Sequence, residues 1–244
     1  MPLREELRSN GEWLFRWRSY LPLVLFALVF PAMIVSRRDT AGQSWLAWDL
    51  FCLAVGLAGE LVRIITVGHV PGGTSGRNTQ SQVAKALNTT GIYSVVRHPL
   101  YLGNFLMWMG PALLPANGWL AVTVTLAFWI YYERIMFAEE EFLRGVYGDT
   151  YVKWASGTPA FIPRLSGWRR TTLPFSIRTV LRRELSSLFG LISVFTVLEL
   201  AGDYGERGRL YLDPAWAAFF LVGLAGFLVL VLLKKTGRLD VEGR

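Results

Sequence analysis

Cysteine, histidine and charged residues are all scarce in this chain of 244 residues. Its single cysteine, Cys52, excludes an internal disulfide framework and a cysteine-based metal site. The only two histidines, His69 and His98, are too few for a typical histidine-ligated metal centre. Charged residues make up 18% of the chain, whereas a typical soluble domain contains about 25%. The composition therefore predicts no metal site and argues against an ordinary soluble domain.

The chain also lacks a recognised nucleic-acid-binding motif and a cleavable signal peptide. Its net charge of +7 is compatible with a nucleic-acid partner, but no motif supports one. In membrane proteins an excess of Lys and Arg marks the cytoplasmic loops. The first twenty residues are too charged for a signal peptide, so we expect the apolar spans themselves to direct the chain to the membrane.

Long apolar stretches dominate what is present, since 52% of the residues are hydrophobic. A membrane-spanning helix needs about 20 consecutive apolar residues. Six stretches approach or exceed this length, and they lie at about residues 20–36, 44–68, 100–116, 118–137, 185–201 and 213–233. The sequence therefore predicts an all-α, polytopic integral membrane protein with about six transmembrane helices.

The distribution of Lys and Arg predicts the orientation of these spans. Of the 25 Lys and Arg residues, twenty lie in the two termini and in the loops that follow the second and fourth spans, and only four lie in the opposite loops. This bias predicts that both termini and both large polar loops are cytoplasmic. A change of composition near residue 165 suggests three parts: a tail and first span (1–43), a core (44–165), and an amphipathic linker with two further spans (166–244).

Ionisable residues inside the spans require a physical explanation, because charge is costly within a bilayer. Glu60 and Arg63 are three residues apart, so they either pair on one helix face or line a polar cavity. The fourth apolar stretch is followed by Glu139, Glu140 and Glu141. These acids form either a solvated helix face or one side of a site that contains a cationic partner.

The segment Arg97-His98-Pro99-Leu100-Tyr101 has the pattern of a helix start. Proline suits the first helical turn, where no backbone N–H is needed. The free N–H groups of that turn, together with Arg97, would favour a carboxylate or a phosphate at the membrane surface. Gly103 and Asn104 follow at positions where a bound group could approach the backbone. The alternative is a helix start that interfacial Arg and Tyr residues merely anchor.

Two motifs together resemble the isoprenylcysteine carboxyl methyltransferase and phospholipid methyltransferase superfamily. The first is GIYSVVRHPLYLGN at residues 91–104, and the second is EEEFLRGVYGDTYVKW at 139–154, followed by Ile162-Pro163. Tyr147 stands where the family usually has Phe. The resemblance covers about residues 44–164 and leaves the last two spans outside it.

The resemblance implies an intramembrane methyltransferase that uses S-adenosylmethionine in a pocket open to the cytosol, without a Rossmann domain. The resemblance also implies which residues bind this cofactor, namely Tyr93, His98, Leu100, Tyr101, Glu139 and Glu140. Arg97 and Arg134 would orient the cofactor carboxylate or an anionic acceptor, and Glu140 would accept the proton of an amine acceptor. Because an acidic acceptor is already ionised at neutral pH, alignment and exclusion of water would suffice for catalysis.

The acceptor is predicted from the loop GHVPGGTSGRNTQSQ at residues 68–82. Its glycines and hydrogen-bond donors suit an anion-binding nest, although such a loop is also compatible with simple flexibility. Its segment G-T-S-G-R-N (73–78), together with L-N-T-T-G at residues 87–91, resembles the bacterial lipid A 1-phosphate O-methyltransferases, which implies a lipid phosphate acceptor in a bacterial inner membrane. Arg77, Asn78, Arg63 and Asn104 are the candidate substrate-binding residues.

Several alternatives remain open. Within the superfamily they are carboxyl methylation of a prenylated cysteine and N-methylation of a phospholipid amine. Outside it they are an NADPH-dependent intramembrane sterol reductase and a membrane scaffold without enzymatic activity. Binding of S-adenosylmethionine, of NADPH or of neither separates these classes. The sequence leaves the oligomeric state open.

Overall fold

A computed structural model describes residues 2–36, 45–74 and 84–243. Within these ranges the chain is all-helical, and no β-strand is present apart from a single bridge between Gly91 and Arg169. The α-helices are α1 (Leu3–Trp17), α2 (Leu21–Val35), α3 (Leu46–Gly68), α4 (Pro99–Leu113), α5 (Gly118–Tyr147), α6 (Asp149–Gly157), α7 (Ile177–Arg207) and α8 (Pro214–Lys235). Two short 3₁₀ turns, η1 (Ile92–Ser94) and η2 (Leu165–Gly167), lie between them.

The protein is a polytopic integral membrane protein. Four helices, α3, α5, α7 and α8, are long and apolar enough to cross a membrane. The other two predicted spans correspond to α2 and α4, each of 15 residues. A helix of that length extends only about 22 Å, less than the hydrocarbon core of about 30 Å. The count of six spans therefore remains a prediction.

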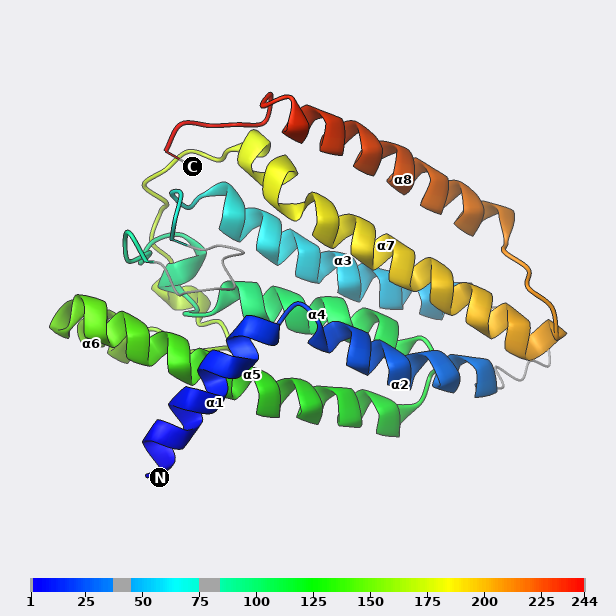
Figure 1. The fold of residues 1–244 in the computed structure, drawn as a ribbon, viewed down its shortest axis with the longest axis horizontal. Helices are drawn as coiled ribbons and strands as arrows, with labels where there is room; N and C mark the ends of the chain where they lie inside the picture. The colour runs from blue at the N-terminus through cyan, green and yellow to red at the C-terminus, as the bar shows by residue number, and fades with distance from the viewer. Residues whose placement is uncertain (1, 37–44, 75–83, 244) are drawn as a thin grey trace.

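The long helices lie side by side, with α1 crossing α5 obliquely (Figure 1). Both termini lie at the same end of the bundle as the loop after α3, the start of α4, α6 and the segment that leads to α7 (Figure 1). The connections between α4 and α5 and between α7 and α8 lie at the opposite end. This arrangement gathers the polar segments that contain the predicted site.

The main apolar core lies between α2, α3, α4, α5 and α7. Its buried side chains include Leu25, Val29, Leu114, Val124 and Phe195. On the outer surface, large apolar side chains such as Leu126, Ile130 and Val222 are exposed, as expected for helices that face lipid. α8 packs against α7 and buries no residue completely.

Small residues bring α3 and α4 into close contact. A Cβ atom added at Gly59 would lie 2.5 Å from the carbonyl oxygen of Gly103, and one added at Gly110 would lie 2.7 Å from that of Cys52. Such close helix pairing is typical of small residues in membrane proteins. Gly103 therefore packs against α3, which corrects the expectation that a bound group approaches the backbone there. The close approach also places Arg63 on α3 beside Asn104 on α4.

Candidate active site

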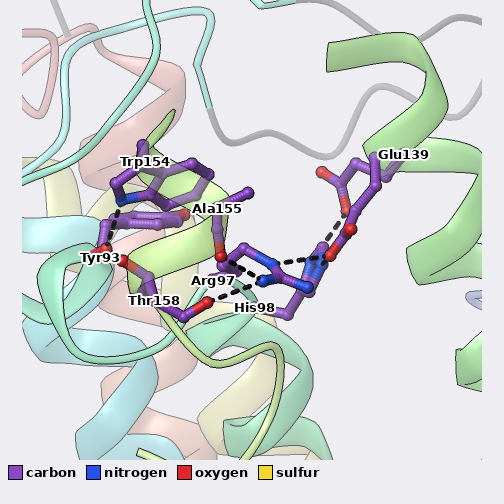
Figure 2. A network of polar contacts seen from close by, with 8 residues as sticks. Tyr93, Arg97, His98, Glu139, Trp154, Ala155 and Thr158 are labelled. Atoms are coloured by element: carbon purple, nitrogen blue, oxygen red, sulfur yellow. Dashed lines mark hydrogen bonds and ion pairs between the residues drawn. The ribbon is translucent and has the colours of Figure 1, made fainter. Parts of the chain in front are cut away.

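The two sequence motifs meet at the start of α4. Two backbone hydrogen bonds join Arg97 N to Pro159 O (2.8 Å) and His98 N to Ala160 O (3.1 Å). The indole of Trp154 in α6 donates a hydrogen bond to the carbonyl oxygen of Tyr93 (3.1 Å; Figure 2). Pro99 opens α4 with His98 as the N-cap, so the predicted helix start is confirmed.

Two glycines of the motifs have backbone conformations that favour glycine. Gly91 has a φ of 61° and begins the turn that leads into η1. Gly148 has a φ of 53° and separates α5 from α6. A residue with a Cβ atom is strained at such φ values, whereas glycine adopts them readily. Glycine therefore permits the turn before η1 at position 91 and the break between α5 and α6 at position 148.

Arg97 links the start of α4 to α5 and α6. Its Nε donates to Oε1 of Glu140 at 2.8 Å, and its Nη1 donates to the carbonyl oxygens of Ala155 (2.8 Å) and Thr158 (2.7 Å). The latter two contacts are visible in Figure 2. Most of the hydrogen-bonding capacity of this guanidinium is thus directed at the protein itself. Arg97 holds three segments together beside the predicted cofactor pocket.

His98 lies between two carboxylates. Its Nε2 is 2.9 Å from Oε1 of Glu140, and its Nδ1 is 3.5 Å from Oε2 of Glu139. Burial alone lowers the pKa of the imidazole, but the hydrogen bonds and negative charges of Glu139 and Glu140 outweigh it and raise the pKa of His98. Only the imidazolium form donates from both ring nitrogens. The imidazole also stacks on Tyr101, with ring centroids 5.5 Å apart.

A cavity of about 940 Å³ extends from this network into the helical bundle. At its polar end the lining includes Asn88, Tyr93, His98, Glu139 and Trp154. Farther along the helices, in the direction of the opposite end of the bundle, the lining becomes apolar and consists of Phe26, Val29, Pro111, Val124 and Val194, among others. One continuous cavity therefore offers a polar environment at one end and a hydrocarbon-like environment at the other.

A second polar cluster lines the middle of the cavity. Arg63 on α3 pairs with Glu184 on α7, with Nη2 and Oε2 2.6 Å apart, and donates from Nη1 to Oδ1 of Asn104 at 2.6 Å. The Asn104 amide donates in turn to the hydroxyl oxygen of Tyr132 on α5 (3.1 Å). These four residues are referred to below as the Arg63 cluster. Glu60 accepts a hydrogen bond from Ser187, also on α7.

The structure brings most of the predicted site residues together. Eight of them line the cavity: Arg63, Tyr93, Arg97, His98, Leu100, Tyr101, Asn104 and Glu139. Glu140 is not among the lining residues within the described ranges, but it accepts a hydrogen bond from Arg97, which is. Arg134 is not among the lining residues within the described ranges, and its Nη1 donates to the carbonyl oxygen of Ile130. The predicted roles of these residues remain predictions. Arg77 and Asn78 lie outside the described residues.

Sequence reasoning missed the residues that α6 and α7 contribute. Trp154 and Tyr151 line the polar end of the cavity, and Glu184 and Ser187 line its middle. Ser186, Gly190 and Leu191 extend the α7 wall. One available signal was Glu184 itself, an acidic residue close to the start of an apolar stretch, where charge requires a reason. The apolar stretch at 185–201 predicts only a membrane span, yet α7, which contains it, forms one wall of the cavity.

Known proteins with similar sequences place the chain in a family. Residues 43–150 match the protein family described as Phospholipid methyltransferase. The chain is 31% identical to the nickel-cobalt-cadmium resistance protein NccN of Alcaligenes xylosoxydans xylosoxydans, over 76% of this chain and 82% of that protein. It is also 31% identical to the cobalt-zinc-cadmium resistance protein CzcN of Cupriavidus metallidurans, over 78% of this chain and 82% of that protein.

A third relative is the protein-S-isoprenylcysteine O-methyltransferase B of Arabidopsis thaliana. It is 30% identical over 59% of this chain and 72% of that protein. No solved structure matches the chain significantly. The chain belongs to the phospholipid and isoprenylcysteine carboxyl methyltransferase superfamily. It is therefore an integral membrane methyltransferase, of a family whose usual methyl donor is S-adenosylmethionine.

Proposed function

We propose that the protein transfers a methyl group from S-adenosylmethionine to an acidic oxygen on the headgroup of a membrane-embedded acceptor. The observation that carries the proposal is the continuous cavity, which joins the network of His98 and Glu139 to an apolar interior. A polar donor and a lipid-anchored acceptor can share such a cavity without either leaving its preferred environment.

The residues at the polar end fit a donor that carries both cationic groups and an aromatic ring. Glu139 provides a carboxylate for a cationic group, and Tyr93 and Trp154 provide aromatic faces, which attract cations and stack on flat rings. S-adenosylmethionine would supply a methyl group that its sulfonium centre strongly activates. We assign its binding to Tyr93, His98, Leu100, Tyr101 and Glu139, with Glu140 and Arg97 holding His98 and α6 in place.

The chain's own contribution is then alignment and exclusion of water. A carboxylate or phosphate is already ionised at neutral pH, so no group of the protein has to remove a proton from it. Arg63 and Asn104, farther into the cavity, lie where an acidic headgroup would follow the donor site. Both a lipid phosphate, including the lipid A 1-phosphate type, and the carboxylate of a prenylated cysteine satisfy this chemistry. The names of the isoprenylcysteine methyltransferases among the relatives support the second acceptor.

We further propose that the polar end of the bundle, with both termini, faces the cytoplasm of a bacterium. The excess of Lys and Arg in the terminal segments and in the two large polar loops supports this orientation. It would place the donor site on the side where S-adenosylmethionine is produced.

Calorimetric titration of the detergent-purified protein with S-adenosylhomocysteine, beside NADPH, tests the proposal. We expect micromolar binding of S-adenosylhomocysteine that His98→Ala abolishes. His69→Ala is the matched control, because the other histidine bonds to the carbonyl oxygen of Ile65 and does not line the cavity. Binding of NADPH instead would identify a reductase, and binding of neither ligand by a folded sample would refute a cofactor site at His98.

A further inference from the structure

The ion pair between Arg63 and Glu184 lies in an unusual place for a purely structural contact. The two side chains are 14% and 6% exposed, and both line the cavity. Removing two charges from water is costly, and apolar residues of similar volume often stabilise a fold equally well. Charged residues at membrane depth commonly mark substrate paths. The position of the pair therefore points to a role in binding.

The Arg63 guanidinium retains hydrogen-bonding capacity. Its Nε and Nη2 both donate to Oε2 of Glu184, and its Nη1 donates to Asn104. Of its five N–H groups, one on each terminal nitrogen has no partner among the described residues. Guanidinium N–H groups acting in pairs are the usual ligands of carboxylate and phosphate oxygens.

The neighbouring Tyr132 adds a third donor to the same place. Its hydroxyl oxygen accepts the hydrogen bond from Asn104, so its own O–H is left to donate elsewhere. Tyr132 lines the cavity, and its ring is fixed by a stacking contact with Phe128, with centroids 4.1 Å apart. The Arg63 cluster thus presents several donors to a ligand, and Glu184 is its only acidic member.

We propose that the Arg63 cluster binds the acidic headgroup of the acceptor and that Glu184 is an internal counter-ion that competes with this headgroup for Arg63. The inference rests on the proposed function and names the part of the cavity that receives the acceptor. When no acceptor is bound, Glu184 neutralises Arg63. An entering acid adds a second negative charge beside the same guanidinium, so Glu184 limits how tightly the acid binds.

This competition favours release of the product. Methylation of an acid oxygen removes one negative charge from the acceptor, because an oxygen lone pair becomes the O–CH₃ bond while the electron pair of the broken S–CH₃ bond remains on the donor sulfur. The methylated headgroup then attracts Arg63 less strongly, whereas Glu184 keeps its full charge. Glu184 is thus a positioning and specificity-determining residue, contributed by a helix outside the matched residues 43–150.

The test compares acids with their own methyl esters. Two pairs of probes are titrated into the full-length protein in the presence of S-adenosylhomocysteine: N-acetyl-S-farnesylcysteine and its methyl ester, and phosphatidic acid and its phosphate methyl ester. We expect the wild-type protein to bind the acid of at least one pair more tightly than the ester. The pair that shows this preference identifies the acceptor as a carboxylate or a phosphate.

Two variants are expected to change this preference in opposite directions. Glu184→Gln keeps a hydrogen-bond acceptor for Arg63 but removes the competing charge, so the acid should bind about tenfold more tightly while ester binding stays unchanged. The double variant Arg63→Gln, Glu184→Gln removes both charges of the ion pair together and should bind acid and ester equally. Arg182→Gln is the matched control: this arginine, on the same helix, pairs with Asp240 and does not line the cavity.

A purely structural role would weaken the binding of acid and ester alike in both variants, and that result would overturn the inference. Equal binding of acid and ester by the wild-type protein in both pairs would also overturn it, as would weaker acid binding by Glu184→Gln. Failure of the proposed function is a separate outcome: the wild-type protein would then not bind S-adenosylhomocysteine at all.

Discussion

The polar end of the cavity and the Arg63 cluster both contain an arginine paired with a glutamate, but the two arginines are held differently. Arg97 donates to two backbone carbonyl oxygens as well as to Glu140. Arg63 donates only to the side chains of Glu184 and Asn104 among the described residues. Backbone partners fix a side chain to the fold, whereas side-chain partners leave it free to exchange. The first arrangement suits a preorganised donor site, and the second suits a site where the ligand changes charge.

The largest effect on methyl transfer is expected from removing the contacts that hold the polar end of the cavity together. Glu140→Ala removes the carboxylate that both Arg97 and His98 contact, so the start of α4 loses its link to α5. We expect methyl transfer to membrane lipids, followed with radiolabelled donor, to fall by about 100-fold or more, because small displacements of a donor site are this costly. Arg97→Ala should have a similar effect.

Glu141→Ala is the control for this prediction. Glu141 is the next residue on the same helix, but it pairs with Arg4 on α1 and does not line the cavity. Its replacement should leave transfer nearly unchanged, since its partner Arg4 is 65% exposed and ion pairs at the protein surface contribute little to stability. Full activity in both Glu140→Ala and Arg97→Ala would exclude the polar end as the site.

The contact between α3 and α4 connects the two regions and should be sensitive to one methyl group. A Cβ atom at position 103 would lie 2.6 Å from Cγ of Arg63 and 2.8 Å from the carbonyl oxygen of Gly59. Gly103→Ala is therefore expected to push the helices apart, to destabilise the protein by about 1–3 kcal/mol, and to weaken binding of both donor and acceptor. Thermal unfolding in detergent measures the first effect, and calorimetry the second.

The matched control is Gly145→Ala in α5, where an added Cβ atom meets nothing within 4 Å. Alanine favours helices over glycine by about 1 kcal/mol, so this variant should be equally or more stable than the wild type. If Gly103→Ala behaved like Gly145→Ala, α3 and α4 would not be in the close contact described above.

The two regions also differ in how far the sequence predicts them. The polar end could be predicted because its residues fall in two short motifs, and the positions of Pro99 and His98 at the helix start follow from local rules. In the Arg63 cluster the sequence indicates Arg63 and Asn104 as candidates but not the partner of Arg63, because Arg63 and Glu184 are 121 positions apart and meet only through the packing of α3 and α7. The spacing of Glu60 and Arg63 predicts that the two residues pair or line a cavity. Arg63 does line the cavity, but it pairs with Glu184 of α7, a contact that the periodicity of α3 does not reveal. The all-helical membrane fold follows from composition, whereas the lengths of α2 and α4 depend on packing.

A smaller effect, on the KM for the acceptor alone, should distinguish the Arg63 cluster from the polar end of the cavity. Tyr132→Phe retains the buried ring but removes the hydroxyl that accepts from Asn104. We expect the KM for the acceptor to rise by roughly three- to tenfold, the usual consequence of losing one hydrogen bond, while S-adenosylhomocysteine binding stays unchanged. Tyr131→Phe is the control, because the Tyr131 hydroxyl bonds to Leu14 on α1 and does not line the cavity. Equal effects of both variants on both ligands would contradict the assignment.

The smallest effect concerns pH and again distinguishes the two regions, since only the polar end contains a histidine. The raised pKa of His98 in the folded protein means that the imidazolium stabilises the fold. This contribution is fully present below the unfolded pKa of about 6.5 and is lost as the pH rises through the raised folded pKa. The unfolding temperature of the wild-type protein should therefore fall across this range by more than that of His98→Gln, as measured by thermal denaturation in detergent. His69→Gln should retain the wild-type slope, and an identical pH dependence in wild type and His98→Gln would show that the two carboxylates do not stabilise a charged His98.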